Sequence, residues 1–462
     1  MSNTPSRVEN KEIFETMPVP TALLKMAIPT IASQLINLIY NIADTWFIGQ
    51  TNNPYMVAAA SLALGVVFIS ISLANFFSVG GGTLVVRLLG SKEEEEARKA
   101  ASLTLLLTFL SSVAFSLVCL TFMDPLLYLL GASENTIGFA RQYMFYVVIL
   151  GCPFSVTSNV MSTMVRNMGY SKEASFGLGM GGFINLLLDP LFMFVLMPPG
   201  HEVMGAAVAT MLSHVITFLY FLYMYGKLKD RSILSIPRRL ERIQRSSMRA
   251  FLSVGLTAAA SGLLYDIAHM SVSRLSASHG DMAVAALGIV MKVERLPNSI
   301  GIGFCLAMVP LAAYNYASHN RERMRAFFNT ARLIGLSVGG VFMILYRLFA
   351  PQVIRIFIED AETIRLGTQF LQARCFAIPF MFLCFHMVHF LQGINRGTHS
   401  LTISFVRQAC LNIPLQILLN YLFGISGLVW SQTVTDVITI AIAYYIYHRL
   451  MKQIETETIN PV

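Results

Sequence analysis

The stretch LIYNIAD at residues 38–44 recurs as LLYDIAH at residues 263–269, 225 positions later. Two further pairs keep nearly the same offset: GSKEEEEAR at residues 90–98 matches ASHNRERMR at an offset of 227, and HVIT at residues 214–217 matches DVIT at an offset of 222. An offset that stays nearly constant over the whole length indicates that the second half of the chain duplicates the first.

The composition predicts that each half spans a membrane several times. Of the 462 residues, 55% are hydrophobic and 13% are charged, whereas soluble domains carry roughly 25% charged residues. A membrane-spanning helix needs about 20 mostly apolar residues. Twelve apolar windows are predicted as spans, six in each half: 21–47, 54–80, 101–123, 139–165, 172–196, 204–226, 250–274, 282–312, 328–350, 366–392, 398–422 and 425–449.

These windows predict an all-α polytopic membrane protein with twelve transmembrane helices in two pseudo-symmetric six-helix lobes. Six spans per half make the two repeats parallel, an arrangement typical of transporters that rock two bundles around a central site. The predicted organisation is a segment at 1–20, an N-lobe at 21–226, a linker at 227–249, a C-lobe at 250–449 and a tail at 450–462.

Basic residues predict the orientation. Loops on the side of the two termini, together with the linker, hold most of the Lys and Arg residues, whereas the opposite loops offer only Arg141, Arg274, Arg355 and Arg365. The positive-inside rule therefore predicts cytoplasmic termini and a plasma-membrane location.

Other functions lack support in the sequence. The net charge of +8 comes from bases between apolar runs rather than from one basic face, so no nucleic-acid partner is expected. The six cysteines lie in apolar stretches without a CxxC pair, and there is no P-loop, GxSxG or HExxH motif. We expect no enzyme activity and no cofactor beyond a coupling H⁺ or Na⁺, with the lipid bilayer and small-molecule substrates as partners of a monomer.

Polar residues within the first predicted span lie on one helical face. Gln34, Asn37, Asn41 and Asp44 follow at spacings of 3, 4 and 3. An ionisable side chain at membrane depth is costly, so Asp44 is a functional candidate. Its alternative role is that of an interfacial residue wetted at the outer leaflet.

Two later spans of the first half add matching groups. Asn185 and Asp189 are four residues apart on one helix, and Thr210 follows on the next. At about 1.5 Å per residue, Asp44, Asp189 and Thr210 lie roughly 5–10 Å below the outer ends of their spans. We expect an oxygen-rich cage in which two desolvated, mutually repelling carboxylates take up a proton near neutral pH, or in which carboxylate, amide and hydroxyl oxygens hold Na⁺.

Several candidates in the second half carry less weight. Asp436, within the last span, is expected either to meet a cationic substrate or to make a structural hydrogen bond. Lys292, Glu294 and Arg295 are expected to neutralise one another, with a place in the cavity lining as the alternative.

In the first half, the Gly80–Gly82 run predicts a tight packing point.

The sequence resembles the multidrug and toxic compound extrusion (MATE) transporters over nearly its whole length. The resemblance rests on Pro29, the polar face ending in DTWFIG at 44–49, RLLG at 87–90, NLLLDP at 185–190, GAAVAT at 205–210, and Arg407-Gln408 ahead of Pro414. It implies a cation-coupled antiporter that expels amphipathic, often cationic compounds, a function associated with antibiotic resistance.

The resemblance also assigns roles to individual residues. It implies an ion or proton site at Asp44, Asn185, Asp189 and Thr210, with Asn37 and Asn41 nearby, and a bend of the first helix at Pro29. Tyr143 matches a tyrosine of the fourth helix. Gln34, Tyr143, His269 and Asp436 are the candidates for the substrate cavity.

The chain departs from some members in its second half. No acid occurs between Glu362 and Asp436, and the repeat partner of Asp44 is His269. This departure favours coupling through the N-lobe. The alternatives left open are a flippase or exporter of lipid-linked or peptide-like cargo on the same fold, and, from another class, a channel or an intramembrane enzyme.

Overall fold

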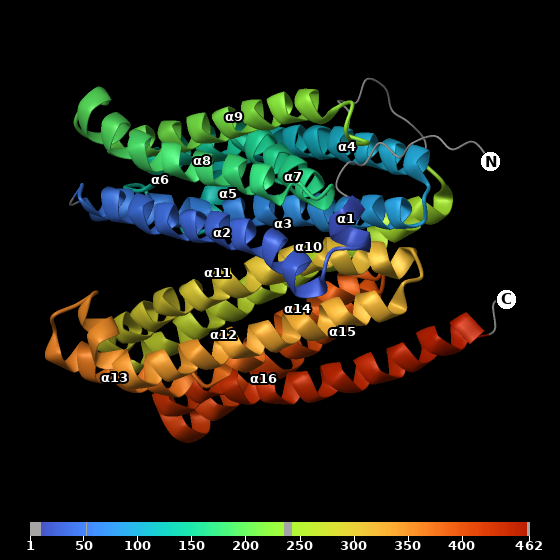
Figure 1. Ribbon diagram of the computed structural model, residues 1–462. Coiled ribbons are helices and arrows are strands. Elements are labelled where there is room, and N and C mark those ends of the chain that lie inside the picture. The colour runs from blue at the N-terminus through green and yellow to red at the C-terminus, as the bar shows by residue number, and fades with distance from the viewer. Residues whose placement is uncertain (1–10, 52, 235–242, 460–462) are drawn as a thin grey trace.

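The computed structural model describes residues 11–51, 53–234 and 243–459, and within these ranges it contains helices and no strands. Figure 1 shows two layers of roughly parallel helices, with the N-terminal half of the chain above and the C-terminal half below. Both ends of the chain emerge at the same end of the molecule, which is called the terminal end here. The predicted all-helical, two-lobe fold is confirmed.

The N-lobe follows a short helix α1. Its elements are α1 (Lys11–Glu15), α2 (Val19–Gly49), α3 (Pro54–Gly90), α4 (Glu94–Thr121), α5 (Met123–Leu129), α6 (Ile137–Met144), η1 (Phe145–Leu150), α7 (Cys152–Asn167), α8 (Ser171–Leu191), η2 (Phe192–Leu196) and α9 (Glu202–Leu228).

The C-lobe comprises α10 (Arg245–Ser276), η3 (Ala277–His279), α11 (Asp281–Ala317), α12 (Arg321–Arg355), α13 (Ala361–Arg374), α14 (Ala377–Gly393), α15 (Gly397–Phe405), η4 (Val406–Asn412) and α16 (Ile413–Ile459). Elements η1, η2 and η4 are π-helical turns within spans, and such turns are frequent at functional sites.

The helices account for the twelve predicted spans within the described residues. Nine segments are long and apolar enough to cross a membrane, and two bent pairs, α6–η1 with α7 at 43° and α13 with α14 at 49°, add two more. The last segment is broken at Gly424, whose backbone is non-helical (φ 60°, ψ −146°), and therefore counts as two. The predicted linker falls partly on residues 235–242, which lie outside the described residues.

The two lobes touch in the half of the molecule near the terminal end. Gly80 of α3 packs on Gly255 of α10, where a Cβ on Gly80 would come within 2.8 Å of the Gly255 Cα. A Cβ on Gly303 of α11 would come within 3.0 Å of the Ile31 Cα on α2. The predicted packing point at Gly80–Gly82 is confirmed: a side chain at Gly80 would force the lobes apart, and Gly81 and Gly82 pack tightly on Thr104 and Asn167 within the N-lobe.

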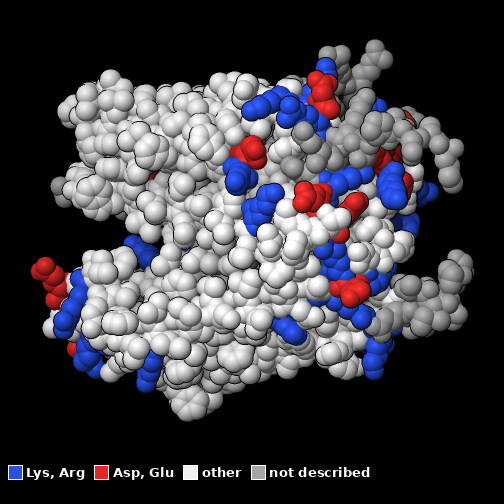
Figure 2. All heavy atoms as spheres, in the orientation of Figure 1, with Lys and Arg blue, Asp and Glu red and all other residues white. Residues whose placement is uncertain are grey.

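The lobes part toward the opposite end. Figure 2 shows a notch between the upper and lower lobes at the end remote from the termini. In this half, large apolar side chains of the inner helices are exposed, including Ile39 and Ile42 on α2 and Ile267 and Met270 on α10. The molecule therefore has one closed end and one open end.

Helix α1 lies across the closed end. Ile13 and Phe14 are buried, each 2% exposed. Arg323, at the start of α12, donates hydrogen bonds to the carbonyls of Phe14 (2.7 Å), Met17 (2.6 Å) and Ile13 (3.3 Å). Lys11 pairs with Glu94 of the N-lobe at 3.5 Å. This segment thus contacts both lobes at once.

Replacing Arg323 should release α1. The substitution Arg323→Ala removes three hydrogen bonds from a charged donor, each worth about 1.5–3 kcal/mol. A cysteine placed at Phe14 should then react with a maleimide at least about tenfold faster, since 1.4 kcal/mol corresponds to a factor of ten. The measurement needs a Cys410→Ser background, because Cys410 is the exposed cysteine of the described residues. Arg355→Ala, at the far end of α12, is the control, and equal labelling in both variants would contradict this role.

Candidate functional site

Close packing of α2 on α8 brings the two N-lobe acids to one level. Glycines on α8 allow this approach: a Cβ on Gly179 would come within 3.0 Å of Ile36, and one on Gly182 within 2.8 Å of Tyr40. Both helices run in the same direction, away from the terminal end. Because Gly179 lies beside Ile36 and Gly182 beside Tyr40, one further turn along both helices places Asp44 beside the turn that begins at Asn185. Asp44 and Asp189 lie within electrostatic range of each other.

A hydrogen-bond network joins three of the predicted residues. The Asn185 side-chain amide donates to Asp189 Oδ1 at 3.1 Å and to Thr210 Oγ1 at 3.3 Å. Asn185 and Asp189 are 1% and 0% exposed, and Thr210 comes from the neighbouring helix α9. The structure therefore brings together Asp44, Asn185, Asp189 and Thr210 as the sequence predicted.

Three oxygen atoms of this group are buried without a hydrogen-bond donor in the described part of the chain. They are Asp44 Oδ1, Asn185 Oδ1 and Asp189 Oδ2. A buried polar atom without a partner costs free energy. Oxygens of this kind bind a proton or a hard cation such as Na⁺. The arrangement fits either ion, with two carboxylates supplying the negative charge and an amide and a hydroxyl completing the donor set.

The remaining polar residues of α2 form a track toward this site. The Asn37 amide donates to Gln34 Oε1 at 3.4 Å, and the Asn41 amide donates to the Asn37 carbonyl at 2.6 Å. Asn41 is exposed, whereas Gln34 and Asn37 are half-buried. These three side chains precede Asp44 on one face of the helix.

Two tyrosines border the acids. Tyr143 is buried on α6, directly before the π-helical turn η1, and lies within electrostatic range of both Asp44 and Asp189. Tyr40 also lies within electrostatic range of Asp44 and Asp189, but the sequence did not predict a role for it. The available signal was its place four residues before Asp44, which puts both side chains on one side of α2.

Pro29 lies inside α2, where it cannot donate a backbone hydrogen bond. The bond that Pro29 cannot make is the one to the Lys25 carbonyl, and the neighbouring Met26 carbonyl accepts hydrogen bonds from the hydroxyls of Thr30 (2.8 Å) and Ser171 (2.7 Å). Because Ser171 begins α8, these bonds tie the two helices of the acid site together below the proline. The bend of α2 at Pro29 stays a prediction.

The C-lobe repeats the N-lobe network with the acid removed. Gln408, Asn412 and Gln432 follow Asn185, Asp189 and Thr210 by 223, 223 and 222 positions. The Asn412 amide donates to Gln408 Oε1 at 2.9 Å and to Gln432 Oε1 at 3.4 Å. The duplicated trio is again hydrogen-bonded, but its donor is Asn412, which stands at the position of the N-lobe acid Asp189.

Two ion pairs neutralise the two buried acids of the described C-lobe, Glu294 and Asp436, whereas Asp266 of α10 is half-buried. Arg407 donates to Asp436 at 2.7 Å, and Gln432 donates to the other carboxylate oxygen at 2.9 Å. Arg374 contacts both oxygens of Glu294, at 2.7 and 2.8 Å. The expectation that Lys292 and Arg295 neutralise Glu294 is wrong, because the bend between α13 and α14 brings Arg374 to it. For Asp436, the geometry supports the structural role.

These pairs border a small polar hollow. His269 lines it, with its ring 4.4 Å from that of Tyr265. The other lining residues are Glu294, Asn298, Arg374, Ala377, Ile378, Met381, Arg407 and Gln432. His269 thus lies in the C-lobe counterpart of the acid site, whereas Asp436 is enclosed behind its arginine.

The fold and these buried polar groups define a class. Two parallel six-span lobes, joined near one end and parted at the other, with polar clusters at corresponding depths in each, are the architecture of a membrane transporter. The sequence model of the MatE family matches residues 29–191 and 258–418, one segment in each lobe. The chain belongs to the MatE family.

Relatives resemble the chain over nearly their full length. It is 27% identical over 450 residues to the multidrug export protein MepA of Staphylococcus aureus (strain MRSA252), covering 96% of this chain and 97% of the relative. The MepA of Staphylococcus haemolyticus is 26% identical over 448 residues, with 96% of both chains covered.

Solved structures share the fold. An outward-facing multidrug resistance MATE family transporter of the MOP superfamily has a TM-score of 0.91 at 22% identity, covering 98% of this chain and 100% of the other. A mutant of the Vibrio cholerae MATE transporter VcmN has a TM-score of 0.88 at 19% identity, with 94% and 97% covered.

Breaking the Glu294–Arg374 pair should destabilise the protein. Both side chains are buried, and removing one partner of such a pair costs about 3–5 kcal/mol, because the other charge is left alone. Arg374→Met should therefore lower the melting temperature in detergent. The double variant Arg374→Met/Glu294→Met should recover most of the loss. A single variant as stable as the wild type would contradict the pairing.

Proposed function

We propose that this transporter is a secondary active efflux antiporter that exports amphipathic, cationic organic compounds in exchange for H⁺ or Na⁺ by alternating access. The observation that carries the proposal is the difference between the lobes. The N-lobe holds two acids, each with a buried oxygen that lacks a donor in the described part of the chain, whereas the buried C-lobe acids Glu294 and Asp436 are paired with arginines. The curated relatives named as multidrug export proteins support the substrate class.

Coupling requires that the ion and the substrate favour opposite states, since a ligand with equal affinity for both states shifts neither. In the proposed cycle, Asp44 and Asp189 bind the ion from the open end and Asn185 and Thr210 orient it. Ion binding removes negative charge at the head of the polar track on α2. A cationic substrate then loses its attraction to this site and leaves through the open end.

The proposal includes an orientation. Figure 2 shows most of the basic side chains of the visible face at the terminal end, with a smaller group at the opposite end of the C-lobe. The positive-inside rule then assigns the terminal end to the cytoplasm and the open end to the outside. We place the protein in the plasma membrane as a functional monomer.

Neutralising either acid should abolish efflux. Asp44→Asn and Asp189→Asn keep the size of the side chain and remove its charge, so the ion no longer binds differently in the two states. Cells that express either variant should accumulate ethidium to the level of cells without the transporter. Asp230→Asn, at an exposed acid of the linker, should retain export. Wild-type export by both N-lobe variants would exclude this coupling site.

Imposed gradients should identify the coupling ion. In proteoliposomes with pH and Na⁺ clamped separately, an inward gradient of the coupling ion should drive ethidium outward through wild-type protein, because the two fluxes share one site. The Asp189→Asn protein should show no response. A flippase of lipid-linked or peptide-like cargo would move its cargo without transporting the dye. Ion conductance without dye transport would indicate a channel.

A further inference from the structure

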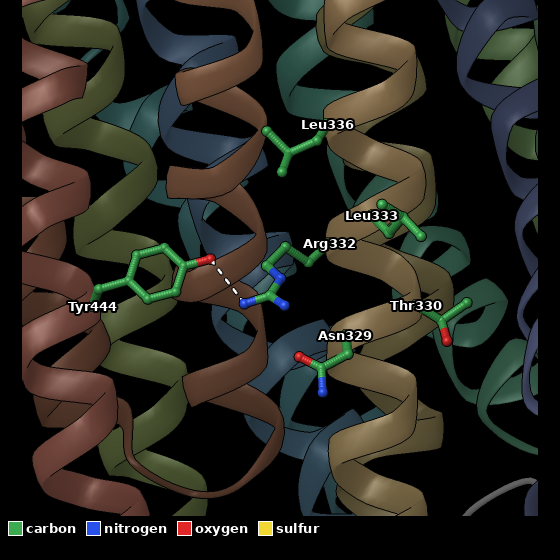
Figure 3. A pocket seen from close by; sticks show the side chains of 6 residues that line it. All are labelled: Asn329, Thr330, Arg332, Leu333, Leu336 and Tyr444. Atoms are coloured by element: carbon green, nitrogen blue, oxygen red, sulfur yellow. Dashed lines mark hydrogen bonds between the residues drawn. The ribbon is translucent and has the colours of Figure 1, made fainter.

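A hollow of about 590 Å³ opens on the flank of the C-lobe between α12 and α16. Its lining comes from Asn329, Thr330, Arg332, Leu333 and Leu336 of α12 and from Tyr444 of α16. Figure 3 shows Arg332 extending from α12 toward α16, with Leu336 on one side of it along the helix and Asn329 on the other. The volume lies within the range of about 300–1,000 Å³ that is usual for small-molecule sites.

Arg332 has spare hydrogen-bonding capacity. Its Nη1 donates to the Tyr444 hydroxyl across 3.4 Å, which is the long limit of a hydrogen bond. A guanidinium carries five N–H donors, and within the described residues the Tyr444 hydroxyl is its one hydrogen-bond partner. The Arg332 Cζ atom lies 6.0 Å from the centroid of the Phe328 ring, so the guanidinium is placed over this aromatic ring. The other donors therefore remain available to a ligand in the hollow.

The hollow faces the membrane. Leu333, next to Arg332, is 66% exposed, and the same helix exposes Val341, Ile344 and Leu348 farther on. Arg332 lies seven residues beyond Arg325, which corresponds to about 10 Å of helix. Tyr444 lies five residues before Arg449, or about 7–8 Å. The guanidinium is thus close to the headgroup level of the leaflet at the terminal end.

An arginine on a lipid-facing flank is costly unless it reaches headgroups or a counter-charge. Basic pockets between transmembrane helices bind anionic lipid headgroups in this way. Arginine suits a phosphate in particular, since its fork makes two parallel hydrogen bonds. The hollow offers this fork beside an amide, a hydroxyl and two leucines.

We propose that this hollow binds the phosphate headgroup of an anionic membrane phospholipid. Arg332 holds the phosphate oxygens, and the Asn329 amide and the Tyr444 hydroxyl donate from either side. The acyl chains run from the headgroup past Leu333 and Leu336 along the apolar flank of α12. This site is separate from the acid site of the N-lobe and does not depend on the proposed ion coupling.

Native mass spectrometry of the purified full-length protein tests the proposal. The protein is titrated with phosphatidylglycerol and, separately, with phosphatidylcholine of the same acyl chains. Wild type should retain phosphatidylglycerol about fivefold better, the factor expected for one basic residue at an anionic headgroup. Arg332→Gln should lose most of this preference. Arg332→Lys should keep part of it, and Arg347→Gln, at the exposed far end of α12, should keep all of it.

Three results would overturn the proposal. The first is equal retention of the two lipids by wild type, a comparison that needs no variant. The second is an unchanged preference in Arg332→Gln, or, if that variant does not fold, in the milder variants Asn329→Ala and Tyr444→Phe. The third is binding of inorganic phosphate that Arg332→Gln removes while lipid retention stays the same, which would mean that the hollow takes free phosphate instead.

Discussion

The structure depends on the cost of burying carboxylates in a membrane protein without positive partners. Asp44 and Asp189 carry buried oxygens that no described side chain satisfies, and such groups persist only where a ligand or a function compensates them. The C-lobe shows the other solution to the same problem. There Asn412 stands at the position of Asp189, and Arg407 and Arg374 neutralise the two buried acids, Asp436 and Glu294, while Asp266 of α10 is half-buried. One duplicated fold thus holds a carboxylate pair with unsatisfied oxygens in one lobe and ion-paired acids in the other.

Helix α2 connects the acid site to the contact between the lobes. It carries Pro29, packs through Ile31 against Gly303 of the C-lobe, and holds Asp44 in its last turns before it ends at Gly49. Its first turns follow α1, which Arg323 holds at the closed end. A change in charge at Asp44 and a change in the separation of the lobes therefore act on the same helix. Two sites that bias one two-state element are the physical basis of coupling between them.

The sequence predicted the fold almost completely. Membrane helices are recognised by the length of their apolar windows, and the internal duplication indicates the same number of spans in each half. The N-lobe site was also predictable, since Asn185 and Asp189 share a helical face and Asp44 ends a polar stripe. What the sequence could not give were contacts between distant segments. Arg374 reaches Glu294 only through the bend before α14, so nearer bases were expected there instead. The contact of Tyr40 with α8 and the contact of the short helix α1 with Arg323 could not be predicted in this way, because neither apolar length nor charge spacing reports which distant segments pack together.

The central claim is that ion and substrate compete through the N-lobe acids. Its most direct test is the affinity of purified protein for ethidium, measured by fluorescence anisotropy over a range of pH and of Na⁺ concentration. By linkage, affinity should fall as the coupling ion binds, and this dependence should vanish in Asp189→Asn. An ion dependence that is the same in wild type and Asp189→Asn would contradict the account.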